Sequence, residues 1–430
     1  MTTTEEIYQI FKENPVISTD TRKIEENCIF FALKGDNFNG NKFTKEALEK
    51  GAGYAVIDEK DYLRSKKTIL VKNVLQTLKD LARLHRGKLG IPILAITGSN
   101  GKTTTKELVS TVLAQIFNVS STEGNLNNHI GVPLTLLKMN AETEFGVVEM
   151  GANHPGEIAE LCAIAEPDFG IITNIGKAHL EGFGSFEGVI KTKSELYHYI
   201  KNKSGIIFYN HDNPILTELT REIQNKISFG QENANFTGEL LSSPPFVHLK
   251  ANFKKGVLYL NTNLTGDYNF ENVMAAACIG NYFEVDPLDI QKAIKNYQPH
   301  NNRSQLINRN GLKIIMDAYN ANPTSMQASI KSFMSNVSDS SYLIIGDMLE
   351  LGNYSKNEHT AILELLKNYP STIVYTVGEN FLEIAHDFNC RPFQNVEQLC
   401  TFLQHTPITK GDVLIKGSRG IQLEKILTCF

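Results

Sequence analysis

The chain has 430 residues, of which 41% are hydrophobic and 21% charged, and its formal net charge is -5. This length exceeds what one compact core usually holds, so two or three domains of an ordinary globular protein are expected. The slight acidic balance excludes an extended nucleic-acid-binding surface, because no excess of basic residues is present to neutralise a phosphate backbone.

The six cysteines contain no CxxC pair, so we expect reduced thiols rather than a disulfide framework or a thiolate zinc site. The N-terminal stretch "MTTTEEIYQIFKENP" has neither the basic start nor the apolar core of a signal peptide. No window reaches a membrane-spanning apolar length. These features predict a cytoplasmic protein without membrane insertion.

Residues 1–87 hold two short strand-like runs, "CIFFAL" and "YAVID", on either side of a turn rich in glycine and asparagine. The stretch "LQTLKDLARLHRGKLG" then places apolar residues on one helical face. The glycines and Pro92 that follow indicate a boundary. We therefore expect a first α/β domain over residues 1–87.

A glycine-bracketed Lys-Thr-Thr follows in "ILAITGSNGKTTTKELVSTVLAQIF", between an apolar run and a helical pattern. Small residues let backbone N–H groups turn inward around an anion, and a helix N-terminus adds positive potential. We expect Lys102 to lie against terminal phosphates and the Thr103 hydroxyl to ligate Mg²⁺. The spacing departs from GxxxxGK[ST], because Ile96 replaces the first glycine, and simple helix capping is the alternative. The apolar face of this helix is expected to run from Leu108 to Phe117.

Continuous apolar runs mark the strands of the central segment: "PILAIT", "FGVVEM", "FGIITNI" and "GIIFYN". Runs of this kind predict a mostly parallel sheet with helices on both faces. Residues 231–265 alternate instead, which predicts antiparallel strands at an edge. The central domain is expected to span residues 88–300.

Glu149 ends one of these strands, where an acid could reach a metal on the phosphate loop; a solvated strand-end acid is the alternative. Lys193 falls in the apolar stripe of "FEGVIKTKSELYHYI", where an uncompensated ammonium is costly and must snorkel, pair or be modified. A carbamylated Lys193 would offer oxygens suited to Mg²⁺. His179, in the loop before, is a candidate neighbouring ligand or a structural histidine.

A second βα series follows residue 301, in "LKIIMDAYNANP", "SYLIIGDM", "TIVYTVG" and "DVLIKGSRG". Each strand ends in a polar loop, the position where open α/β sheets bind ligands. Residues 301–430 are expected to form the last of three α/β domains.

Four motifs together resemble the Mur ligases of peptidoglycan synthesis: "TGSNGKTTTKE", "EGNLNNHIGVPLTLL", "EMGANHPGEI" and "NIGKAHLEGFGSFEGVIKTKSE". The later stretches "NNRSQ", "DAYNANPTSM", "IIGDMLELG" and "KGSRG" are similar to the member that adds a dipeptide. The resemblance is weakest between residues 215 and 260. It implies an N-terminal UDP-substrate-binding domain, a central P-loop ATPase domain and a C-terminal Rossmann-like domain.

The resemblance also implies the reaction. ATP would phosphorylate the terminal carboxylate of UDP-N-acetylmuramoyl-tripeptide, and the amine of D-alanyl-D-alanine would displace phosphate from that acyl phosphate. Two Mg²⁺ ions are implied, because an anionic carboxylate must approach an anionic phosphate. The partners would be these two substrates, with no nucleic acid and no membrane, and a monomer is expected.

Site residues carry over where the motifs match. The implied catalytic residues are Lys102, Glu149, His179 and Lys193. The implied metal ligands are Thr103 and Glu149 for one ion, and Glu149, His179 and carbamylated Lys193 for the other. The implied ATP-binding residues are Gly98, Ser99, Asn100, Gly101, Lys102, Thr103, Thr104, Asn269, Asn272, Arg303 and Asp317. The implied substrate-binding residues are Thr21, Arg22, Lys34, Asn125, Asn127, Asn128, His129, Asn320, Asn322, Ser418 and Arg419.

Some assignments have plain structural alternatives. "NANP" could be a helix-capping turn, and "KGSRG" an ordinary strand-to-helix loop. Family members commonly carry His where Tyr268 precedes Asn269, so this tyrosine could stack on adenine instead.

Other functions fit the sequence less well. A ligase that adds a diamino acid would carry a DNPR-type signature where this chain reads "DAYNANP". Folate polyglutamylation would leave the first domain unexplained. A noncatalytic nucleotide-binding scaffold would have no need for Lys102, Glu149, His179 and Lys193 together, and no second motif supports a switch-type NTPase.

Overall fold

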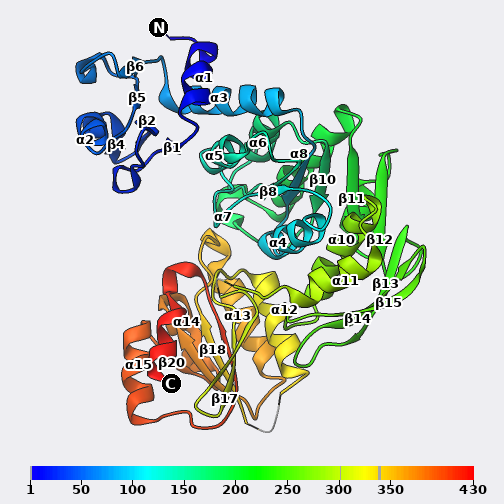
Figure 1. Cartoon of the computed structure of the whole chain (residues 1–430). Helices are drawn as coiled ribbons and strands as arrows, with labels where there is room; N and C mark the ends of the chain where they lie inside the picture. Colours follow the sequence, from blue (N-terminus) through cyan, green and yellow to red (C-terminus); the bar gives the residue numbers. More distant parts are fainter. Residues whose placement is uncertain (1, 301, 338–339) are drawn as a thin grey trace.

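The computed structural model describes residues 2–300, 302–337 and 340–430. Met1 and Asn301, at which two of the predicted domains begin, lie outside the described residues. Figure 1 shows the N-terminal part, in blue, and the C-terminal part, in orange and red, at different sides of the central part. The three parts are built on sheets of four, nine and six strands, which confirms the three-domain α/β fold.

The first part is a parallel sheet with the strand order β1-β2-β5-β6. Its strands β2 and β5 are the apolar runs that the sequence predicts. Its elements are α1 (Thr4–Glu13), β1 (Ile17–Ser18), β2 (Ile29–Phe31), β3 (Lys34–Gly35), β4 (Phe38–Asn39), α2 (Thr44–Glu49), β5 (Tyr54–Ile57), β6 (Thr68–Leu70) and α3 (Val74–Leu89).

Helix α3 joins the first part to the central part. The Asn73 side chain accepts a hydrogen bond from Gln76 N at its start, and Gly90 ends it with a φ of 65°. Contacts to the central part hold it in place, including Arg86 Nη2 at 2.8 Å from Asp168 Oδ2. The predicted boundary at residue 87 falls within this helix and stays a prediction.

The central sheet has the order β15-β14-β13-β12-β11-β10-β7-β9-β8. Strands β7 to β12 pair in parallel, and β13, β14 and β15 pair antiparallel at one edge, as predicted. Its elements are β7 (Ile93–Thr97), α4 (Lys102–Leu113), β8 (Val119–Ser121), α5 (Gly131–Lys138), β9 (Phe145–Glu149), α6 (Glu157–Ala165), β10 (Phe169–Ile172), α7 (Leu180–Phe183), α8 (Phe186–Asn202), β11 (Ile206–Asn210), α9 (Pro214–Leu219), β12 (Lys226–Gly230), β13 (Phe236–Ser242), β14 (His248–Phe253), β15 (Gly256–Asn261), α10 (Asn269–Tyr282) and α11 (Pro287–Asn296).

Helix α4 is shorter than its apolar pattern predicts. The Leu113 carbonyl accepts hydrogen bonds from both Ile116 N and Phe117 N, which closes a turn there. Ile116 is 45% exposed, so the expected apolar face does not extend through it. The expectation of a helix running to Phe117 was therefore wrong at its end.

The C-terminal sheet has the order β16-β17-β21-β18-β19-β20, with only the β16–β17 pair antiparallel among the described strands. Placing the last strand, β21, between β17 and β18 gives the doubly wound arrangement of a Rossmann-like domain. Its elements are β16 (Gln305–Arg309), β17 (Leu312–Met316), α12 (Pro323–Met334), β18 (Ser341–Gly346), α13 (Ser355–Leu366), β19 (Ile373–Val377), α14 (Glu379–Ile384), β20 (Arg391–Phe393), α15 (Val396–His405) and β21 (Gly411–Lys416).

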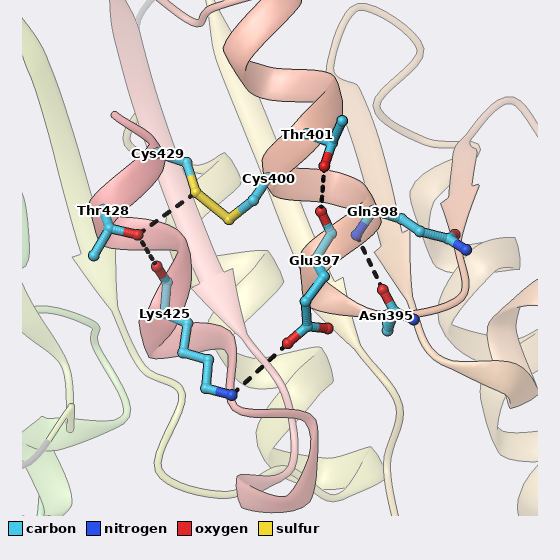
Figure 2. The surroundings of a disulfide bond; sticks show 8 residues. All are labelled: Asn395, Glu397, Gln398, Cys400, Thr401, Lys425, Thr428 and Cys429. Carbon is cyan, nitrogen blue, oxygen red and sulfur yellow. Dashed lines mark hydrogen bonds and ion pairs between the residues drawn. A yellow bond between two sulfur atoms is a disulfide. The ribbon is translucent and has the colours of Figure 1, made fainter.

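One cysteine expectation was wrong. Cys400 on α15 and Cys429, near the C-terminus, form a disulfide with their Cα atoms 5.6 Å apart (Figure 2). The last turns of the chain pack against α15, and this brings together two thiols that are 29 residues apart in sequence. The other cysteines, Cys28, Cys162, Cys278 and Cys390, are free, so the pair is a single link and not a framework.

None of the described helices combines the length and the apolar character that crossing a membrane requires.

Candidate active site

A cavity of about 630 Å³ lies where the central and C-terminal parts meet. Its wall is formed by four parts of the chain: the phosphate loop, the ends of strands, the first turn of α10 and the start of the C-terminal part. The predicted site residues on this wall are Ser99, Asn100, Gly101, Lys102, Thr103, Thr104, Asn125, Asn127, Asn128, His129, Glu149, His179, Asn269, Asn272, Arg303, Asp317, Asn320 and Asn322. Gly98, Lys193, Thr21, Arg22, Lys34, Ser418 and Arg419 are not among its lining residues.

The phosphate loop depends on two glycines with positive φ. Gly98 has a φ of 145° and Gly101 a φ of 77°, and a Cβ at either position would collide with Thr173 or Asn272. The Lys102 ammonium donates to the Gly98 carbonyl at 2.8 Å, and burial lowers its pKa from the usual lysine range. The loop therefore has the shape of an anion-binding site, and its lysine is hydrogen-bonded to a carbonyl group of the same loop.

Glu149 stands at the end of β9 with 2% of its surface exposed. Its Oε1 accepts a hydrogen bond from Asn127 Nδ2 at 2.8 Å, and its backbone N–H donates to Thr122 Oγ1 at 2.9 Å. Its Oε2 is buried and has no hydrogen-bond partner among the described residues. A buried carboxylate oxygen without a hydrogen-bond partner can be satisfied by a hard cation or by a hydrogen-bond donor of a bound ligand.

Lys193 is buried, with 1% exposure, on the apolar face of α8. Its Nζ reaches only the Ala152 carbonyl at 3.5 Å and lies 5.4 Å from the centre of the Phe183 ring. Burial, and next the positive charge of Lys102, lower the pKa of Lys193 to about 7. Since no ion pair involves it in the described part of the chain, neither snorkelling nor pairing explains this lysine. It lies behind the cavity wall, which Ala152 forms.

His179 precedes α7 with a φ of 52°, and its side chain lines the cavity. Its Nδ1 lies in close contact with Glu350 Oε2, which belongs to the C-terminal part, but this buried nitrogen makes no aligned hydrogen bond among the described residues. This partner was not anticipated.

The predicted metal ligands are only partly of the usual types. Among the described residues, no three or more His, Cys, Asp and Glu side chains gather as a metal site. Glu149 and His179 supply two such groups, and Thr103 and Lys193 would have to complete the set. The buried, unpaired Glu149 Oε2 is the observation that fits a cation here.

The first turn of α10 presses against the phosphate loop. Asn272 Oδ1 accepts a hydrogen bond from Thr105 Oγ1 at 3.0 Å, and its Nδ2 donates to Asn269 Oδ1 at 2.8 Å. The Tyr268 hydroxyl pairs with Ser304 Oγ at 2.9 Å, and burial raises its pKa. Tyr268 thus ties the start of α10 to the residue directly before β16, and it is one of the residues that line the cavity.

Comparison with known proteins shows which family has these features. The Mur ligase middle domain matches residues 96–280, the Mur ligase glutamate ligase domain residues 302–419, and the Mur ligase catalytic domain residues 15–94. The chain belongs to the Mur ligase family. Similar proteins include the UDP-N-acetylmuramoyl-tripeptide–D-alanyl-D-alanine ligases of Bacillus subtilis, 35% identical over 96% of this chain and 92% of that protein, and of Escherichia coli, 31% identical over 96% and 92%.

Solved structures agree. MurF from Acinetobacter baumannii superposes with a TM-score of 0.87 at 29% identity, covering 96% of this chain and 92% of that one. MurF from Thermotoga maritima in complex with ADP gives 0.84 at 29% identity, covering 96% of each. A UDP-N-acetylmuramoyl-L-alanyl-D-glutamate–2,6-diaminopimelate ligase shares the fold with a TM-score of 0.55 at 16% identity, covering 94% and 89%.

This Mur ligase also has cavity residues that the sequence did not single out. Lys416, at the end of β21 and 2% exposed, donates to Asp317 Oδ2 at 2.6 Å. The Arg303 guanidinium lies 3.6 Å from the centre of the Tyr319 ring. The one available signal for Lys416 was its place at a strand end, directly before "GSRG", because polar residues at such ends reach the ligand crevice.

The first-domain candidates in this Mur ligase lie apart from the cavity. Lys34 Nζ is 2.8 Å from both Asp58 and Glu59, and Arg22 pairs with Asp20 at 2.7 Å. The Thr21 carbonyl accepts a hydrogen bond from Lys50 at 3.0 Å.

The last two candidates lie beside the cavity without lining it. Ser418 is buried; its Oγ accepts from Leu349 N and donates to the Ala321 carbonyl. Arg419 is exposed, 5.2 Å from the centre of the Tyr319 ring. The site roles of all these residues stay predictions.

Proposed function

We propose that this Mur ligase joins D-alanyl-D-alanine to UDP-N-acetylmuramoyl-tripeptide with ATP, in the synthesis of peptidoglycan precursors in the cytoplasm. Relatives named for this reaction align over 96% of the chain. The observation that carries the proposal is the single cavity in which the phosphate loop, Glu149 and the C-terminal loop around Asn322 meet. Residues 1–87 bind the uridine nucleotide, residues 88–300 hold ATP, and residues 301–430 close over it.

The chemistry has two steps. The tripeptide carboxylate attacks the γ-phosphorus of ATP, the bond to the ADP oxygen breaks, and an acyl phosphate forms. The dipeptide amine then attacks the acyl carbon, loses a proton and expels inorganic phosphate, which leaves with the electrons of the C–O bond. Lys102 and the loop amides stabilise the charge on the transferred phosphoryl group, as an anion site at a helix N-terminus does.

Mg²⁺ supplies the remaining positive charge when it is bound. Thr103 and Glu149 would hold one ion, and Glu149, His179 and a carbamylated Lys193 would hold the other. The carbamate forms when the neutral amine of Lys193 attacks CO₂ and releases a proton. A pKa of about 7 leaves this amine unprotonated in much of the protein at neutral pH, which favours that attack.

The other assigned residues bind the substrates. Around ATP we place Gly98, Ser99, Asn100, Gly101, Thr104, Asn269, Asn272, Arg303 and Asp317. Along the peptide and at the dipeptide end we place Asn125, Asn127, Asn128, His129, Asn320, Asn322, Ser418 and Arg419, and at the uridine end Thr21, Arg22 and Lys34. The active form is a monomer.

The test is ATP-dependent phosphate release with UDP-N-acetylmuramoyl-tripeptide, with and without D-alanyl-D-alanine, together with the product mass. Release that needs the dipeptide, with a mass gain of one joined dipeptide, supports the proposal. Release only with the shorter muramoyl-dipeptide and a diamino acid would move the chain to a neighbouring reaction. No release with either pair would overturn the proposal.

A further inference from the structure

The loop after β18 reaches from the C-terminal domain to α7 of the central domain, where the orange and teal segments meet (Figure 1). The Glu181 backbone N–H donates to the Glu350 carbonyl at 3.2 Å, and the Tyr354 hydroxyl donates to the Gly184 carbonyl at 3.2 Å. A Cβ on Gly352 would lie 3.3 Å from Glu181, so the two backbones are close. The domains therefore touch at this point through main-chain and side-chain atoms.

The side chains that meet here are His179 and Glu350, whose Nδ1 and Oε2 atoms are in close contact, although Nδ1 makes no aligned hydrogen bond among the described residues. Both residues have left-handed backbones, with φ of 52° for His179 and 62° for Glu350. Non-glycine residues adopt this conformation at a cost and keep it where the surroundings enforce it, often at functional sites.

The Glu350 loop is held firmly from behind. Buried Asp347 accepts hydrogen bonds from Asn380 N at 2.8 Å and Phe381 N at 3.0 Å. On the residues between, Met348 N donates to His359 Nε2 at 3.0 Å, and Leu349 N donates to Ser418 Oγ at 2.9 Å. The Glu350 carboxylate is thus presented on a fixed backbone and not on a loose loop.

We propose that Glu350 is a positioning residue for His179, set in place by the approach of the C-terminal domain. A carboxylate on Nδ1 fixes the Nδ1–H tautomer and the ring orientation, which leaves the Nε2 lone pair for a divalent cation. The central domain alone supplies His179 without this partner. The second metal site would therefore become able to bind its cation only when the C-terminal domain closes. This inference rests on the proposed function.

A second ion pair across the same boundary provides the control. Lys177 Nζ lies 2.5 Å from Glu358 Oε1, and this pair contains none of the proposed metal ligands. If Glu350 acted only by joining the domains, Glu358→Gln and Glu350→Ala would have similar consequences. If Glu350 positions His179, only the Glu350 variant changes the histidine.

The experiment compares the wild-type chain with Glu350→Ala, Glu350→Gln and Glu358→Gln. Nitrogen-15 NMR of histidine-labelled, metal-free protein reports the His179 tautomer, with His179→Gln to assign the signal. Mn²⁺ affinity in the presence of ADP is measured by electron paramagnetic resonance. We expect Glu350→Ala to lose the Nδ1–H preference and to bind Mn²⁺ about tenfold more weakly, Glu350→Gln to restore part of both, and Glu358→Gln to leave both unchanged.

An unchanged tautomer and unchanged Mn²⁺ affinity in Glu350→Ala would overturn the inference. An equal loss in Glu358→Gln would also overturn it, because joining the domains would then suffice as an explanation. Neither readout needs turnover, so a wild-type chain that fails to ligate the proposed substrates would refute the proposed function separately. Thermal unfolding of each variant identifies a folding defect, in which case the milder Glu350→Gln decides.

Discussion

Asn322 donates a side-chain N–H to Asn100 Oδ1 at 2.7 Å, so the first residue before α12 holds the phosphate loop 222 residues earlier in the chain. The same Asn322 side chain caps α12, because its Oδ1 accepts a hydrogen bond from Ser325 N at 2.9 Å. The side-chain amide of Asn322 therefore hydrogen-bonds both within the C-terminal domain and to the phosphate loop.

These two roles of Asn322 can be separated. Serine is a good helix cap but is too short to reach Asn100, so Asn322→Ser should keep α12 stable and lose the contact between domains. We expect the midpoint of thermal unfolding to change little and the KM for ATP to rise several-fold. Asn322→Ala, which loses both, should also cost about 1 kcal/mol of stability. Equal KM values in wild type and Asn322→Ser would show that the contact does not help ATP binding.

Gly101 should tolerate no side chain. Its φ of 77° and the crowding by Asn272 predict that Gly101→Ala loses about 1 kcal/mol or more of stability and most ATP affinity. Gly87 is the matched control, because it lies inside α3 with open space around it. Gly87→Ala should stabilise the chain by about 0.5–1 kcal/mol. Calorimetric ATP binding and chemical unfolding of both variants provide the comparison.

Lys106 should position Glu149 from behind. It is 4% exposed, and its Nζ donates to the Thr122 carbonyl at 2.7 Å, while Thr122 Oγ1 accepts from Glu149 N. Lys106→Met keeps the volume but loses this bond, and we expect kcat to fall about tenfold, the equivalent of ~1.4 kcal/mol. Lys138→Met, on an exposed lysine paired with Glu123, should leave kcat unchanged. A wild-type kcat in Lys106→Met would refute this role.

Lys193 gives a pH prediction. Its amine titrates near pH 7 when folded but near 10.4 in an unfolded chain, so the unfolded state binds more protons between these values. The contribution of this group to the free energy of unfolding therefore rises with pH from 7 to about 10. Carbamate formation needs the unprotonated amine, so the carbon-13 signal of the protein carbamate, formed from labelled bicarbonate, should grow from pH 6 to 8.5.

The Lys193 variants test the carbamate directly. Lys193→Ala should lose the carbamate signal and nearly all turnover, and a short carboxylic acid should restore some activity. Lys191→Ala, on the exposed side of the same helix, should behave as wild type. Full turnover in Lys193→Ala would exclude a catalytic carbamate.

The disulfide predicts a thiol count. Thiol titration of the unfolded, unreduced chain should find the free cysteines Cys28, Cys162, Cys278 and Cys390, and reduction should add Cys400 and Cys429. Closing a loop of this length stabilises a chain by up to about 3.6 kcal/mol in the chain-entropy relation, so reduction should lower the unfolding midpoint. Six reactive thiols before reduction, as expected of a chain kept in a reducing compartment, would show that the pair is not oxidised in solution.

The sequence predicts best where local pattern and function coincide. The buried strands were recognisable as apolar runs, and the phosphate loop and Glu149 follow directly from two of them. Lys193 was noticeable because it breaks an apolar stripe, and the structure buries it as the stripe implies.

The sequence did not predict the features that depend on packing between distant segments. Glu350, Tyr319 and Lys416 reach the site only because the C-terminal domain docks beside α7 and the phosphate loop. The Cys400–Cys429 link has the same origin, since nothing in the spacing shows that the last turns pack on α15. The early end of α4 depends on a turn at Leu113 that competes with the apolar pattern.

Helix α3 has a consequence for substrate length. Its 16 residues span ~24 Å, and ion pairs such as Lys79–Glu160 and Arg86–Asp168 fasten it to the central domain. The uridine-binding candidates therefore stand at a set distance from the phosphate loop. A nucleotide bound at these candidates would deliver its carboxylate to ATP only if its peptide covered the remaining distance. On the proposed function, we therefore expect the fixed helix to select for substrate length, so that precursors one or two amino acids too short fail to react even when their uridine ends bind normally.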